Sequence, residues 1–135
     1  MIKKRVDKRA KELMENFRVK NIEIIGACSF VNFFGKESLG MRQIRGMGNI
    51  FLLGKPEYRL YFEMWKPKRE FNIPIVNITG CEITKWHLKK SKNRPLLKIL
   101  FTNEKGEADS VAWLIRNLNE WKDSIDRIVE KNQNK

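Results

Sequence analysis

The sequence has few of the residue types that carry most enzyme chemistry. Its 135 residues include one histidine, His87, and two cysteines, Cys28 and Cys81, which lie far apart without a CxxC motif or a histidine companion. Such spacing gives neither a disulfide framework nor a zinc site. We therefore expect both cysteines to be reduced and buried, and we expect a noncatalytic protein with no cofactor and no metal.

Long hydrophobic runs are missing too. The longest fall far short of the roughly 18 to 20 apolar residues that span a bilayer. The basic segment 1–9 leads into no apolar stretch and no small-residue cleavage site, unlike a secretory signal. We expect a soluble, cytoplasmic protein, and any association with the inner face of the membrane would be peripheral.

Acidic residues are scarce relative to basic ones, with 16 Asp and Glu against 28 Lys and Arg and a net charge of +12. Residues 1–20 carry 8 basic and 3 acidic side chains, and residues 85–98 carry 6 basic and none acidic. The rest of the chain is nearly neutral. A hydrophobic fraction of 41% argues against disorder, and the length suits one domain. The charge therefore indicates attraction to an anionic partner.

Two segments have the apolar spacing of amphipathic helices. Residues 1–18 place one apolar stripe against a basic face, and a second helix begins at Asn117, where Glu120 completes a capping box. We expect a basic N-terminal helix in residues 1–20, a main domain in 21–131 and a polar tail in 132–135. The first helix has three candidate positions: on the domain, on a second subunit of a homo-oligomer, or on a membrane.

Between these helices the pattern predicts strands separated by turn residues. In residues 58–65, Leu60, Phe62 and Met64 alternate with Arg59, Tyr61 and Glu63, which predicts one buried and one solvated face. The loop 89–95 is expected to join two of the strands, and Pro74 restricts its strand to a sheet edge or a strand end. The predicted strands are 22–34, 46–53, 58–65, 70–75, 78–87, 96–102 and 108–115. They predict a mainly β fold, a seven-stranded antiparallel sandwich or partly open barrel capped by the C-terminal helix.

Short apolar motifs in these strands resemble pleckstrin-homology-like (PH-like) domains, in particular GRAM-type and bacterial members. They are Asn32-Phe33-Phe34, the segment 46–52, the segment 59–63, and Ile73-Pro74-Ile75 leading into 78–83. The resemblance covers residues 22–130 and implies a noncatalytic interaction domain. Members of this superfamily bind phosphoinositides, proteins or peptides, so the resemblance does not choose the ligand.

Two basic sets are candidate sites. In phosphoinositide-binding relatives the loops after the first and third strands hold the headgroup, so the resemblance implies a ligand site at Lys36, Arg42, Arg45, Lys66, Lys68 and Arg69. A second basic patch follows from the residues themselves, because several cations near one tryptophan suit an anionic surface. This patch comprises Lys85, Trp86, Lys89, Lys90, Lys92 and Arg94.

The partner class stays open between an anionic membrane lipid and an acidic protein surface. The alternative is a basic nucleic-acid-associated module, in which the second patch contacts phosphates and Trp86 stacks on a base. No RNP, KH or helix-turn-helix signature supports that alternative. Three carboxylates, Glu104, Glu107 and Asp109, suggest a cation site, but without EF-hand spacing a solvated turn is favoured.

Overall fold

The computed structural model describes residues 2–36, 46–64, 68–87 and 90–133, with side chains from 8–36, 46–64, 68–87 and 94–132. Seven strands and two α-helices follow one another in the order that the sequence predicts. They are α1 (Ile2–Val19), β1 (Ile24–Lys36), β2 (Gly46–Leu53), β3 (Arg59–Met64), β4 (Arg69–Pro74), the short 3-10 helix η2 (Ile75–Asn77), β5 (Ile78–His87), β6 (Lys90–Thr102), β7 (Ala108–Leu114) and α2 (Leu118–Gln133).

All seven strands form one antiparallel sheet in the order β4-β3-β2-β1-β7-β6-β5. The long strand β1 joins its two halves, because its first part pairs with β2 and its end pairs with β7. The register with β2 shifts between Ile24 and Gly26 and again between Cys28 and Val31. At the second shift Phe30 has a φ of 61°, a left-handed value that marks a bulge and bends the strand. The expected mainly β, antiparallel fold is confirmed.

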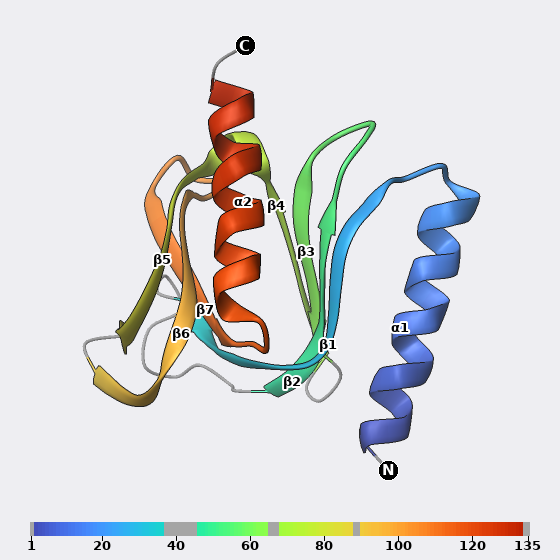
Figure 1. Ribbon diagram of the computed structural model, residues 1–135, viewed down its shortest axis with the longest axis horizontal. Helices are drawn as coiled ribbons and strands as arrows, with labels where there is room; N and C mark the ends of the chain where they lie inside the picture. The colour runs from blue at the N-terminus through green and yellow to red at the C-terminus, as the bar shows by residue number, and fades with distance from the viewer. Residues whose placement is uncertain (1, 37–45, 65–67, 88–89, 134–135) are drawn as a thin grey trace.

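The inner face of the bent sheet holds the main core. Its centre includes Phe33, Phe62 and Trp113, whose rings pack against one another with centroids 5.4 to 6.1 Å apart. The helix α2 covers this core with Trp121 and Ile125, both buried. Figure 1 shows α2 on one side of strands β1 to β3 and α1 on the other. The C-terminal helix therefore caps the domain as the sequence predicts.

The outer face of β1 to β3 is covered by α1, which packs on its own chain. Ala10, Leu13 and Phe17 of the helix stripe meet Phe51 and Tyr61 of the sheet in a second buried cluster. Phe17 lies edge-on to both rings, with centroids 5.4 and 5.7 Å away. The helix ends where Asn21 takes a left-handed φ of 59°, a conformation that asparagine tolerates well.

Two expectations about the strands are wrong. The face of β3 expected to be solvated is covered, since Tyr61 and Glu63 are only 8% and 3% exposed beneath α1. The expected loop 89–95 is mostly strand, because β6 already begins at Lys90. Pro95 is accepted there since β7 pairs with β6 only from Leu97 onward, which leaves one side of the strand without that partner.

The position of β4 agrees with the expectation from Pro74, because β4 is an edge strand of the sheet.

Among the helices in the described part of the chain, none is long and apolar enough to cross a membrane.

Candidate functional site

The hairpin of β5 and β6 carries the second basic patch and presents a tryptophan to solvent. The Trp86 side chain is 55% exposed, whereas the next residue, His87, is fully buried. This follows from strand geometry, in which consecutive side chains point to opposite faces. Lys85 and Arg94 are exposed on the same hairpin. The hairpin therefore exposes a large aromatic ring and two cations to solvent.

His87 holds the end of this hairpin against the rest of the sheet. Its Nε2 donates a hydrogen bond to the backbone oxygen of Gly35, 3.0 Å away, near the end of β1. Close by, the backbone N–H of Trp86 donates to the Thr84 hydroxyl at 3.0 Å, where the register of β5 with β6 shifts. The only histidine is thus a structural anchor for the basic hairpin. The sequence contains a signal for the burial of His87. In a strand that exposes Trp86, the next side chain points to the opposite face.

The other members of the second patch are described only in part. Lys90 and Lys92 lie in β6, but their side chains, like all of Lys89, lie outside the described residues. The structure thus places Lys85, Trp86 and Arg94 on one exposed hairpin, and the convergence of the full patch stays a prediction.

The ligand site implied by family resemblance is only partly described as well. Strands β1 to β4 form an antiparallel meander, so β1 and β3 finish at the same end of the sheet. Lys68 and Arg69 are exposed at the start of β4, where an Arg69 N–H donates to the Lys68 backbone oxygen. Arg42, Arg45 and Lys66 lie outside the described residues.

Lys36 turns inward instead of joining an exposed basic surface. Its Nζ lies 3.6 Å from the Asp109 carboxylate and about 6 Å from the ring centroids of Phe71 and Phe101. Asp109 is almost completely buried. Much of the positive charge of Lys36 is therefore balanced within the protein.

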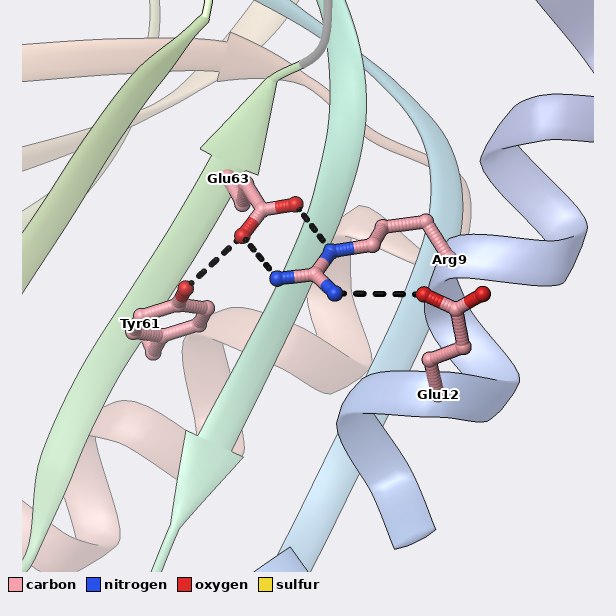
Figure 2. A network of polar contacts seen from close by, with 4 residues as sticks. All are labelled: Arg9, Glu12, Tyr61 and Glu63. Atoms are coloured by element: carbon pink, nitrogen blue, oxygen red, sulfur yellow. Dashed lines mark hydrogen bonds and ion pairs between the residues drawn. The ribbon is translucent and has the colours of Figure 1, made fainter. Parts of the chain in front are cut away.

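A partly buried ion pair that the sequence did not reveal joins α1 to the sheet (Figure 2). The Arg9 guanidinium donates two hydrogen bonds to the Glu63 carboxylate, at 2.6 and 3.1 Å, and one to Glu12 at 3.2 Å. The Tyr61 hydroxyl donates to the same Glu63 carboxylate at 3.0 Å. The sequence pattern predicted an amphipathic helix and a solvated face of β3. Neither prediction indicated that Arg9 and Glu63 would meet. The apolar Phe51 and Leu53 on this face of β2 were the available signal that something covers it.

Opposing effects act on the ionisation of this cluster. Burial raises the pKa of Glu63, but the hydrogen bonds from Arg9 and Tyr61 outweigh it and hold the pKa below its ordinary value. Burial and the Glu63 charge raise the pKa of Tyr61. The hydrogen bond to Glu63 raises the pKa of Arg9. The cluster is thus a charged pair with a neutral phenol at neutral pH, which suits a structural role.

The two cysteines differ in one respect from expectation, because both are half-buried and not fully buried. Burial, together with the nearby Asp126 charge, raises the pKa of the Cys81 thiol to about 12. A nucleophilic thiolate is therefore disfavoured at this position.

Comparison with protein-family models, with curated proteins and with solved structures gives no match to this chain.

Proposed function

We propose that this chain is a noncatalytic, PH-like interaction domain of the GRAM type that binds an anionic membrane surface through the β5–β6 hairpin. The observation that carries the proposal is the 55% exposure of Trp86 on a hairpin that also exposes Lys85 and Arg94. Tryptophan favours the interface between water and lipid, because its ring is apolar and its N–H is polar. Each cation near an anionic leaflet adds about 1 kcal/mol of attraction.

Anchoring of the hairpin supports this role. The hydrogen bond from His87 to Gly35 limits the motion of the hairpin end, so little ordering is needed when Trp86 meets a surface. The inward position of Lys36 makes the hairpin a better candidate than the β1–β2 connection for the first contact.

Vesicle sedimentation tests the proposal. Vesicles of phosphatidylcholine alone and vesicles with 30% phosphatidylserine would be compared at 50 and 300 mM NaCl. We expect binding only to the anionic vesicles, weakened at high salt because screening shortens the reach of the charges. Trp86→Ala should weaken binding at both salt concentrations, since the lost contact is apolar.

A charge-matched pair of variants separates a site from diffuse attraction. Lys85→Glu with Arg94→Glu should reduce binding about tenfold or more, because two attractive contacts of about 1 kcal/mol each become repulsive. Arg127→Glu with Lys131→Glu changes the net charge equally at exposed positions of α2 and should have a much smaller effect. Equal losses from both pairs would contradict a hairpin site.

Parallel arms address the other partner classes. Single-stranded and duplex 20-nucleotide DNA at the same salt concentrations test the nucleic-acid alternative, which stronger binding to DNA than to vesicles would favour. Absence of binding to vesicles and to DNA at 50 mM salt would overturn both and leave an acidic protein as the candidate partner.

A further inference from the structure

A cleft of about 690 Å³ lies between β4 and the turn that joins β6 to β7. Five consecutive residues of β4, from Glu70 to Pro74, line it on one side, and the segment from Phe101 to Ala108 supplies most of the other. A hollow on one face of a strand would collect alternate residues, because neighbouring side chains point to opposite faces. Consecutive lining residues show that this cleft follows the edge of the strand.

The edge of β4 that faces this cleft is available for strand pairing. β3 pairs with β4 along its whole length, and no other strand in the described part of the sheet pairs with β4. A free strand edge offers backbone N–H and C=O groups to an added strand. Five residues at about 3.3 Å each make an edge about 16 Å long.

The charges on the cleft have the opposite sign to the charge of the whole chain. Its lining includes three exposed acidic residues, Glu70, Glu104 and Glu107. Glu70 is paired with Glu63 across the strands, so its side chain lies on the sheet face that carries Glu63. Two lysines also line it, but the Lys36 ammonium is balanced by the buried Asp109 carboxylate at 3.6 Å. Lys105 remains as the other cation of the lining. The cleft is therefore locally acidic in a chain of net charge +12.

The turn that carries two of these carboxylates is held in place. The Asn103 side-chain oxygen accepts hydrogen bonds from the N–H groups of Lys105 and Glu107 at 3.0 and 3.1 Å. The Asn103 side-chain amide also donates to Asp109, at 3.3 Å. Gly106 closes the turn with a φ of 78°. Little conformational freedom is lost at this turn when a ligand binds, which favours affinity.

We infer that this cleft binds an extended, basic peptide segment, which adds a strand to the β4 edge and places Lys or Arg side chains against Glu104 and Glu107. The rings of Phe71 and Phe101 line the cleft as well and can pack against the aliphatic stems of such side chains. Backbone pairing supplies affinity, and the carboxylates select a cationic sequence. This site uses other residues than the hairpin proposed to contact membranes, so either proposal can fail alone.

Three fluorescein-labelled peptides test the inference by fluorescence anisotropy at 150 mM NaCl. The first is Arg-Val-Arg-Val-Arg. The second replaces each arginine with citrulline, which keeps the shape and removes the charge. The third carries N-methyl groups on both valines and on the second and third arginines, so both edges of the peptide lose the N–H groups that strand pairing needs. We expect the first peptide to bind and the other two to bind at least about tenfold more weakly.

Substitutions at exposed positions locate the site. Glu104→Lys with Glu107→Lys should weaken binding of the arginine peptide at least tenfold, and the turn should persist because Glu107 takes part in it through its backbone. Glu57→Lys with Glu130→Lys makes the same change of charge at exposed positions outside the lining and should leave binding within about twofold. Circular dichroism checks that each variant is folded.

Several results would overturn the inference. These are no binding of the arginine peptide to the wild-type protein, equal affinity for the citrulline or N-methyl peptide, and equal losses in the two double variants. Vesicle sedimentation of the Glu104→Lys, Glu107→Lys variant keeps the two sites distinct, since its binding to anionic vesicles should not fall.

Discussion

The Arg9 guanidinium on α1 and the Glu63 carboxylate on β3 form a bidentate ion pair between residues 54 positions apart in the chain. Glu63 is 3% exposed, so its charge is almost removed from water. Two parallel hydrogen bonds require one orientation of the helix, whereas an apolar stripe tolerates several. The pair therefore fixes where α1 docks as well as contributing to its affinity for the sheet.

Removal of one partner should be costly. Arg9→Ala leaves the Glu63 carboxylate buried with only the Tyr61 hydroxyl as a described hydrogen-bond donor, so we expect a loss of about 1.5 to 3 kcal/mol in the free energy of unfolding. Urea unfolding followed by tryptophan fluorescence measures it. Lys11→Ala, an exposed position on the same helix, should change stability by less than about 0.5 kcal/mol.

A double substitution tests the origin of that cost. Arg9→Met with Glu63→Met removes both charges and should recover most of the loss, because a buried ion pair is often no more stabilising than apolar residues of similar size. If Arg9→Ala is no more destabilising than Lys11→Ala, the pair contributes nothing to docking.

Stability should depend on pH through Glu63. Its pKa is lowered in the folded protein, so its contribution is present above the ordinary value of 4.5 and is lost as the pH falls through the folded-state pKa. We expect the stability difference between the wild-type protein and Glu63→Gln to be constant from pH 7 to 5 and to shrink below about 4.5. Urea unfolding of both proteins between pH 7 and 3 measures this difference, and a constant value throughout would contradict the assignment.

Close approach of β2 and β3 should make Gly48 irreplaceable. A Cβ atom there would lie 2.0 Å from the Glu63 backbone oxygen and 2.7 Å from the Met64 Cα, and backbone atoms cannot rotate away as a flexible side chain can. Gly48→Ala should cost about 2 to 3 kcal/mol or prevent folding. Gly26→Ala is the control, since its nearest neighbour would be a Trp121 ring atom at an ordinary 3.6 Å. Similar melting temperatures for both variants would refute the steric argument.

Loss of the His87 anchor should loosen the basic hairpin locally. His87→Ala removes the donor to the Gly35 backbone oxygen, so we expect a stability loss of about 1 to 3 kcal/mol. Amide hydrogen exchange should rise most in Trp86 and His87 and in their partners Ser91 and Lys90, at the end of the hairpin. Uniform acceleration across all strands would show that His87 supports the whole core and not the hairpin.

Most of the fold could be predicted from local patterns. Alternation and turn residues placed β2 and β5 at their observed bounds, and the capping residues Asn117 and Glu120 located the start of α2. These features are encoded within a few neighbouring residues, which is the range over which side-chain periodicity is informative.

The error about the face of β3 arose because another element covers it. Tyr61 and Glu63 alternate with apolar residues as solvated positions do, and only the tertiary contact with α1 makes them buried. The left-handed conformation of Phe30 was equally unpredictable, since phenylalanine does not favour positive φ and only the two sheet halves impose the bend. The candidate site was predictable in its charge, but the inward turn of Lys36 depends on Asp109, 73 positions away.

The shared strand β1 has a consequence for how the chain tolerates changes in length. A residue inserted between Val31 and Phe33 would reverse the direction of the following side chains, next to partners in both β2 and β7. Extra residues between Pro56 and Glu57, in the turn from β2 to β3, would leave the register of β1 unchanged, and they would follow the hydrogen bonds that Gly54 and Lys55 form with Glu23. We therefore expect this domain to accept loop insertions at that turn and to reject even single-residue insertions in the second half of β1.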